Sequence, residues 1–305
     1  MTIAFIHPHK SFLPEIDAYI DFFNTQGIDI RVIHSKTNDT INADVEWYFM
    51  GMYNGNKKKS TIVIHEYASA SVPPFHKEKD FLKRSYNPKP DYRLFLNQYV
   101  KERLNFKDNI PFGFRDMGIP DLFFQSKAAT NKEYDFIYTG SIEPGRRLEK
   151  LLQCFTKNDL QTHSILILSK GYQYIATQFA SFSNIDFKGP VPHEAMAEYI
   201  SKARFCINYV PDKEPFNQQT SVKFLEYLAL KIPVISSKYP WTEQFQQQHG
   251  GDFFYLEKDL SNFTWKNVNQ HNYSFPDLHN WNWNSQIKKS GICEFLQSKF
   301  KELRF

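Results

Sequence analysis

Short apolar runs alternate along this chain with longer amphipathic stretches, a pattern that predicts parallel β-sheets covered by helices. In the first part, the expected strands are residues 3–6, 29–33, 45–50, 61–65 and 92–97, and a helix is expected over 14–25. The pattern restarts after residue 133. There the expected strands are 134–139, 164–169, 185–187, 205–209 and 233–236, and the expected helices are 147–155, 193–202 and 221–230. The fold class is therefore α/β, with two Rossmann-like parallel-sheet domains.

A polar segment without periodicity, residues 125–132, separates the two patterns and is interpreted as a linker. It divides the chain into a first domain (1–124), a second domain (133–279) and a helical tail (280–305). Two α/β domains joined by a linker imply a cleft. Ligands of such sheets bind beyond the carboxyl ends of the strands, where loops run into helices.

The segment 220–236 contains the most informative residue, Glu226. Thr220 and Ser221 are typical of a helix N-terminus, and the helix that follows has apolar residues on nearly every side. A carboxylate buried there without a hydrogen bond would cost several kcal/mol, roughly. Lys223 is the only adjacent partner in the sequence, and a pair of ligand hydroxyl groups is the alternative.

The loop at residues 138–147 follows an expected strand and opens an expected helix. Gly140 and Gly145 allow a tight turn, and Arg146 with Arg147 suits bidentate binding of phosphate. Arginines in a first helical turn are more often simply solvated. Their position still favours an anion, because a cation at a helix N-terminus is electrostatically unfavourable without one.

A second strand-to-helix loop, residues 211–221, ends in the hydroxyls of Thr220 and Ser221. Together with the arginine loop, it predicts a pyrophosphate pocket. Glu226, just beyond this loop, could then accept hydrogen bonds from a ribose diol.

The length, composition and net charge of the chain exclude some classes of protein. The 305 residues contain 17% aromatic residues, which argues against disorder, and a net charge of +4 is too small to indicate nucleic acid. Three widely spaced cysteines are interpreted as reduced core thiols. Neither an export signal nor a membrane span is visible, so we expect a cytoplasmic protein, with peripheral contact at the inner face of the membrane as an option.

Three segments, 140–147, 187–196 and 221–235, resemble the C-terminal half of a GT-B glycosyltransferase. The group they resemble is the large retaining class called family 4, or "glycosyl transferases group 1". The resemblance covers residues 134–240 and extends to the first domain only in outline. It implies two Rossmann-like domains, a C-terminal helix that crosses back to the first, a nucleotide-diphosphate sugar held mainly by the second, and no metal or other cofactor.

By matching position, the resemblance implies that Arg146 contacts phosphate and that Glu226 binds ribose. Two positions depart from the family pattern. Gln218 replaces a glutamate that contacts the sugar, and Ser141 replaces an arginine after the first loop glycine. The expected donor-binding residues are Gly140, Ser141, Arg146, Arg147, Gln218, Thr220, Ser221 and Glu226.

In the first domain, His65 ends an expected strand and resembles the family histidine that faces the donor sugar. It is the expected catalytic residue. Glu66 either orients His65 or lies outside the site. Lys10 and Ser11, after the first strand, are candidates for the acceptor side, and a metal site at the nearby histidines is not expected.

The leading hypothesis is a sugar transferase acting on a glycan or lipid-linked acceptor, in capsule or O-antigen synthesis. A sugar-nucleotide epimerase of the same shape is the alternative, and the absence of a carboxylate at Gln218 counts against it. A catalytically silent sugar-nucleotide-binding scaffold is the third hypothesis. Nucleic acid is not an expected partner.

Overall fold

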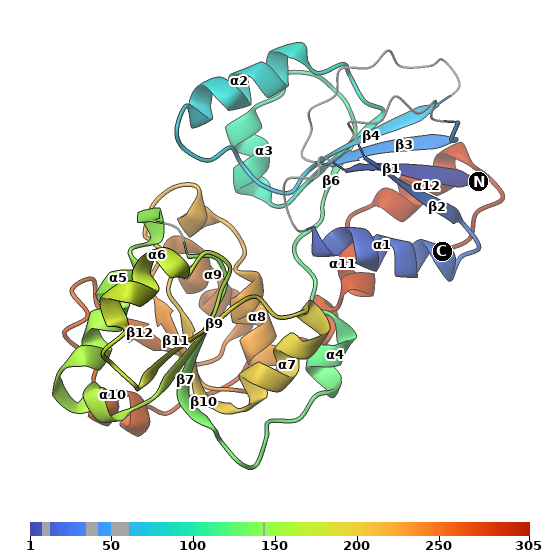
Figure 1. The fold of residues 1–305 in the computed structure, drawn as a ribbon. Coiled ribbons are helices and arrows are strands. Elements are labelled where there is room, and N and C mark those ends of the chain that lie inside the picture. Colours follow the sequence, from blue (N-terminus) through green and yellow to red (C-terminus); the bar gives the residue numbers. More distant parts are fainter. Residues whose placement is uncertain (8–12, 35–41, 50–60, 143) are drawn as a thin grey trace. The chain divides into compact units, whose positions relative to one another are not determined.

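The computed structural model describes residues 1–7, 13–34, 42–49, 61–142 and 144–305. The chain divides into two compact units: unit 1 holds residues 1–118 and 280–305, and unit 2 holds residues 119–279. Each unit contains a six-stranded sheet whose strand pairs are parallel, with helices packed on it (Figure 1). The predicted fold class, α/β with two Rossmann-like sheets, is confirmed.

Unit 1 has the strand order β2-β1-β3-β4-β5-β6. Its strands are β1 (Thr2–His7), β2 (Asp29–His34), β3 (Val45–Phe49), β4 (Ile62–Tyr67), β5 (Tyr92–Phe95) and β6 (Phe112–Phe114). Its helices are α1 (Pro14–Asn24), α2 (His76–Tyr86), α3 (Gln98–Leu104), α11 (Trp283–Lys289) and α12 (Ile292–Lys299). Alternate strand residues such as Phe5 and Trp47 pack against Tyr19 and Phe23 of α1, so one face of the sheet is an aromatic core.

The tail of the chain belongs to unit 1 because it packs on β5 and β6. Tyr92 donates a hydrogen bond to the carbonyl oxygen of Ser290 at 3.0 Å, and its ring stacks on Phe295 at 4.5 Å. A β-carbon at Gly113 would collide with the same carbonyl. The close approach of the two backbones therefore requires glycine at this position.

A buried charge cluster joins α1, β3 and β4 to the segment after β6. Arg115 Nε donates to Glu66 Oε1 at 2.8 Å, and Arg115 Nη2 bonds both Glu66 and, at 3.3 Å, Glu15 Oε1. Trp47 Nε1 donates to the other Glu66 oxygen at 2.8 Å. Burial raises the pKa of Glu15, an effect that Arg115 opposes. Glu66 is therefore a structural partner of Arg115 and does not orient His65.

We expect Arg115→Met to lower the free energy of unfolding by about 3–5 kcal/mol, because two carboxylates would remain buried without their cation. Arg31→Met is the matched control. Arg31 pairs with Asp29 at the surface, where both side chains are more than half exposed, so its loss should cost less than about 1 kcal/mol. Urea unfolding of both variants checks this, and similar losses would show that the cluster is not a structural element.

Unit 2 has the strand order β12-β11-β10-β7-β8-β9. Its strands are β7 (Tyr134–Thr139), β8 (Ile165–Leu168), β9 (Ile185–Lys188), β10 (Ala203–Asn208), β11 (Val234–Ser237) and β12 (Phe254–Leu256). Its α-helices are α4 (Asp121–Gln125), α5 (Leu148–Leu152), α6 (Gln173–Ala176), α7 (His193–Ser201), α8 (Val222–Ala229), α9 (Pro240–His249) and α10 (Trp265–Gln270). Short 3₁₀ segments include η1 (Pro144–Arg146), η2 (Gln153–Thr156), η3 (Asn158–Thr162), η4 (Thr177–Phe179) and η5 (Phe216–Gln218), and η6 (His279–Trp281) spans the end of the unit.

The helices of unit 2 cover both faces of its sheet. Helices α5 and α10 lie on one side, and α7 and α8 lie on the other, against β10 and β11 (Figure 1). This arrangement buries β7, β8 and β10 on both faces, which explains why these strands are nearly continuous apolar runs.

The structure refines several predicted boundaries. The expected helix over 147–155 is a short α5 that continues as the 3₁₀ segment η2. Unit 1 ends at Gly118 rather than at Phe124, and α4 packs on α7 and α8 in unit 2. Residues 126–133 contain no helix or strand. Within the described residues, no helix has both the length and the apolar character that crossing a bilayer requires.

Candidate functional site

The predicted site residues of unit 2 gather at the carboxyl end of its sheet. Strand β7 leads into the turn at Gly140 and then into η1, whereas β10 leads through η5 into α8. Because β7 and β10 are neighbouring parallel strands, their two loops leave the same edge of the sheet. This is the edge at which open α/β sheets bind ligands.

The first loop turns at Gly140, whose φ of +116° favours glycine. The turn is held to α8 by Tyr227, whose hydroxyl accepts a hydrogen bond from Thr139 N at 3.0 Å and lies 2.8 Å from Thr139 Oγ1. Ser141 is exposed, and its carbonyl oxygen accepts a hydrogen bond from Tyr138 at 3.4 Å. The position of α8 relative to the turn is therefore fixed by buried hydrogen bonds.

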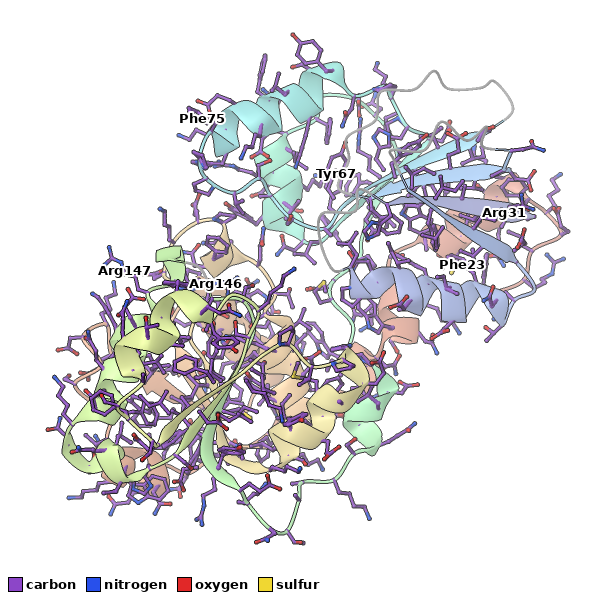
Figure 2. All side chains as sticks on the ribbon, viewed as in Figure 1. Phe23, Arg31, Tyr67, Phe75, Arg146 and Arg147 are labelled. Carbon is purple, nitrogen blue, oxygen red and sulfur yellow. The ribbon has the colours of Figure 1, made fainter. Side chains whose placement is uncertain are left out.

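The two predicted arginines differ in their surroundings. Arg146 is half-buried at the end of η1, with its guanidinium 5.4 Å from the centre of the Phe216 ring in η5. Its Nε atom is buried and has no hydrogen-bond partner among the described residues. Arg147 is exposed, with a left-handed backbone (φ +50°) directly before α5 (Figure 2). The structure thus brings Arg146, rather than Arg147, against the second loop.

The second loop is ordered by η5 and by polar contacts from its end. Gln218 closes η5, where its backbone N–H donates to the Pro215 carbonyl at 3.1 Å, and both Gln218 and Thr220 are half-buried. These two side chains lie in the same loop as Phe216, the ring that Arg146 covers. Gln218 and Thr220 thus lie in the part of the loop that approaches the arginine.

Ser221 occupies the predicted position directly before α8, but its hydroxyl does not cap the helix. Ser221 Oγ instead donates to Asn208 Oδ1 at 2.9 Å, and the buried Asn208 amide donates to Ser236 Oγ at 2.9 Å and to Tyr239 at 3.2 Å. This polar network joins the ends of β10 and β11 to the start of α8. The predicted helix N-terminus is confirmed at Ser221, but its hydroxyl makes no capping hydrogen bond and is directed to Asn208 instead.

Glu226 is 4% exposed, as the sequence predicted, but its partner is a protein side chain. His193 Nε2 lies 2.7 Å from Glu226 Oε1. Burial raises the pKa of Glu226, and the hydrogen bond with His193 lowers part of that shift. The partner is therefore not Lys223, the only obvious adjacent candidate in the sequence, but a histidine from another helix.

His193 is the site residue that sequence reasoning missed. It begins α7 directly after Pro192, and its ring lies 5.5 Å from that of Phe123. The segment 187–196 carries part of the family resemblance, yet its histidine was not singled out. A signal for it was present in the sequence. Side chains that follow the carboxyl end of a parallel strand lie at the edge of the sheet where ligands bind, and His193 follows β9 in this way.

His65, the predicted catalytic residue of unit 1, is fully buried on β4. Its ring lies between those of Tyr48 and Tyr67, at 5.9 and 6.2 Å, and its Nδ1 atom is 3.4 Å from the Tyr67 hydroxyl. Glu66, the next residue, points to the opposite face of the sheet. A catalytic role for His65 stays a prediction.

Other features of the described chain lie apart from these loops. Lys10 and Ser11, the acceptor-side candidates, fall outside the described residues. No group of three or more metal-ligating side chains occurs in the described part of the chain. A hollow of about 320 Å³ lies between η2, η3 and the loop after β12, and its lining includes none of the predicted donor residues.

Comparison with known proteins agrees with this geometry. Residues 128–260 match the family model described as "Glycosyl transferase-like". A search of curated proteins by sequence found no match. AviGT4, a glycosyltransferase involved in avilamycin A biosynthesis, has a similar structure, with a TM-score of 0.60 and 10% identity over 99% of this chain and 98% of that chain.

Two further structures extend the comparison. A T4 phage BGT mutant in complex with UDP-glucose has a TM-score of 0.51 and 13% identity over 100% of both chains. The UDP-GlcNAc 2-epimerase from Methanocaldococcus jannaschii has a TM-score of 0.52 and 12% identity over 98% of this chain and 100% of that chain. This chain has the GT-B fold. The predicted resemblance to GT-B glycosyltransferases is thereby confirmed, and the candidate site lies within the matched segment.

We expect His193→Phe to lower the free energy of unfolding by about 1–3 kcal/mol near neutral pH, because Glu226 loses its hydrogen-bond partner. The folded pKa of Glu226 is raised, so the folded state holds its proton more tightly than the unfolded chain does. The carboxyl's contribution to stability then falls as the pH rises from the ordinary value of 4.5 through the folded pKa. The cost of His193→Phe should therefore grow over that range.

Urea unfolding at several pH values measures this effect. The control repeats His193→Phe in a Glu226→Gln background, where neither protein of the comparison carries the carboxyl. There the cost of His193→Phe should lose the pH dependence that Glu226 causes. A cost that is constant from pH 4.5 upward would mean that the pair does not control the protonation of Glu226.

Proposed function

We propose that this protein is a glycosyltransferase that moves a sugar from a nucleotide-diphosphate sugar to a glycan or lipid-linked acceptor, with retention at the anomeric carbon. The observation that carries this proposal is the convergence of two strand-to-helix loops at one edge of unit 2. One loop supplies Arg146, and the other supplies the start of α8 with the buried carboxylate of Glu226. The GT-B fold supports the assignment but does not choose among reactions.

In the proposed reaction, Arg146 binds the diphosphate of the donor. The bond from the anomeric carbon to the diphosphate oxygen breaks, and negative charge grows on that oxygen. The anomeric carbon forms a new bond to an acceptor hydroxyl oxygen, and the hydroxyl proton passes to the departing diphosphate. A guanidinium already positioned at the turn stabilises that charge without reorganisation. Arg147, exposed at the start of α5, and the hydroxyl of Thr220 would bind the diphosphate as well, and Gln218 would contact the sugar. The Ser221 hydroxyl would join them only by turning its hydrogen from Asn208 to a phosphate oxygen. We propose that no resident metal takes part, so activity should persist in EDTA.

Glu226 is proposed to bind the ribose of the donor. His193 holds one carboxylate oxygen, which orients the group, and the hydroxyls of a ribose diol would donate to the carboxylate as well. A carboxylate with a pKa raised by burial gains from these additional donors, because each stabilises its charged form.

Nucleotide binding tests the proposal. Calorimetry with UDP, GDP and ADP should identify one that binds the wild type, and Glu226→Ala should weaken that affinity by about 10- to 100-fold through the loss of charge-assisted hydrogen bonds. Glu198→Ala is the matched control, because Glu198 is an exposed carboxylate of the same unit, paired with Lys202. Equal affinity of wild type and Glu226→Ala would remove Glu226 from the site.

An epimerase is the second candidate, because UDP-GlcNAc 2-epimerases share this fold at a comparable TM-score. The neutral amide of Gln218, where a carboxylate would serve proton abstraction, favours transfer. A product formed from the donor alone, without acceptor, would identify an epimerase. Binding without hydrolysis, transfer or epimerisation would instead identify a silent scaffold.

The proposed acceptor pathway is the synthesis of a surface polysaccharide, at the inner face of the membrane. Helix α2 and the turn before it supply a surface suited to this location. Phe75 is 70% exposed (Figure 2). Tyr86 and Phe81 are 74% and 53% exposed. The same helix carries the basic residues Lys77, Lys79, Lys83 and Arg84. Exposed aromatic side chains among cations match the interface of an anionic bilayer.

We expect the protein to sediment with vesicles that contain phosphatidylglycerol and to remain in solution with phosphatidylcholine vesicles, because the attraction is partly electrostatic. Phe75→Ser combined with Phe81→Ser should abolish sedimentation without loss of stability, since both side chains are already exposed. Val32→Ser, at an exposed apolar residue of β2, is the control. Unchanged sedimentation of the double variant would exclude α2 as the contact.

A further inference from the structure

Lys223 carries a cation into the interior beside the Gly140 turn. It is the second residue of α8, and its Cδ atom would lie 3.9 Å from a β-carbon built at Gly140. The ammonium group lies 4.0 Å from the centre of the Tyr138 ring, at the end of β7. Part of the lysine side chain reaches the surface, but its nitrogen is buried and has no hydrogen-bond partner among the described residues.

This position is electrostatically unfavourable for an amine. An ammonium donates up to three hydrogen bonds, and a contact with the face of a ring replaces only part of its hydration. The N-terminal turn of a helix also disfavours cations. Arg146 adds repulsion, so burial and this guanidinium together hold the pKa of Lys223 well below its ordinary value.

Among the described residues, the two cations also have no compensating carboxylate. No ion pair of Lys223 or Arg146 occurs in the part of the chain that the structure describes. The contrast with Arg115 in unit 1 is informative, because that buried guanidinium is neutralised by two glutamates. Two neighbouring cations beside a glycine turn, with no counter-ion in the described part of the chain, are suited to a ligand with two negative groups.

We propose that Lys223 is a second diphosphate-binding residue, which acts with Arg146 beside the Gly140 turn. This inference rests on the proposed function, and it assigns to α8 a phosphate contact in addition to the ribose contact of Glu226. The ammonium donates to phosphate oxygens of the bound nucleotide diphosphate, while its hydrocarbon chain stays packed beside Gly140 and Tyr138.

Binding of a diphosphate should change the protonation of Lys223. The described charged and titratable groups that face Lys223 are Arg146 from η1 and the phenol of Tyr138 from β7. A diphosphate brings negative charge next to the amine and restores its pKa. Binding at a pH where the free amine is neutral therefore takes up a proton from solution.

Calorimetry of the nucleotide diphosphate selected above tests the inference with wild type, Lys223→Met and Lys266→Met. Lys266 is the matched control, because it is also the second residue of a helix, α10, but is exposed. Lys223→Met should weaken binding by about 10- to 100-fold, as expected for a charge-assisted hydrogen bond, and Lys266→Met should leave it unchanged.

Two readouts separate this role from a structural one. Lys223→Met should unfold at the same temperature as wild type or higher, because a buried, unpaired amine is replaced by an apolar group. Titrations in buffers of different ionisation enthalpy should show net proton uptake for wild type and for Lys266→Met, and less for Lys223→Met. The proton measurement on wild type stands even if Lys223→Met does not fold.

The outcomes distinguish the two proposals. Wild type that binds none of the nucleotide diphosphates overturns the proposed function and this inference together. Wild type that binds one of them, with equal affinity and equal proton uptake in Lys223→Met, overturns the role of Lys223 alone and leaves the function of the site intact.

Discussion

The structure of the second unit depends on how helix α8 buries polar side chains among hydrocarbon. Tyr227 is hydrogen-bonded to Thr139 at the end of β7, and Glu226 is hydrogen-bonded to His193 at the start of α7. Each bond offsets a desolvation cost, and each fixes α8 against a different loop of the sheet edge. The candidate site is therefore a direct product of packing. The hydrogen bonds of Tyr227 and Glu226 offset the cost of burying polar groups of α8, and they also hold Gly140, Arg146 and Lys223 close together.

The two units handle buried charge in different ways. In unit 1, Arg115 is bonded to two glutamates, and one of these is also bonded to a tryptophan, so the cluster is complete within the protein. In unit 2, Arg146 and Lys223 converge without a described counter-ion, and their buried nitrogens lack hydrogen-bond partners among the described residues. A buried cation that is paired with carboxylates stabilises the fold. Buried cations without a counter-ion can still donate hydrogen bonds to an anionic ligand. This difference, rather than burial itself, distinguishes a structural charge from a candidate ligand contact.

The elements that were predicted correctly from the sequence are those with a clear hydrophobic pattern. Strands buried on both faces, such as β7 (Tyr134–Thr139), are short apolar runs and were predicted within a few residues. Helix α2 was missed because its apolar residues are exposed, so it shows no periodic stripe directed at a core. The expected helix over 147–155 was too long because the chain tightens into a 3₁₀ segment after Leu152. Tertiary packing decided that ending, and local propensity does not report it.

The sequence by itself determined two parallel α/β sheets, the glycine turn followed by arginines, and a carboxylate in a helix with apolar residues on most of its sides. These are local properties, since they follow from side-chain spacing and from the sterics of glycine. Only the tertiary structure decided which side chains contact one another. His193, 33 residues away in the sequence, is hydrogen-bonded to Glu226, and Ser221 is hydrogen-bonded to Asn208. Lys223 contacts the ring of Tyr138 rather than its sequence neighbour Glu226. Hydrogen bonds and charge contacts depend on distances of a few ångströms between separate elements. The sheet order and the packing of α7 and α8 set those distances, and the one-dimensional pattern does not contain them.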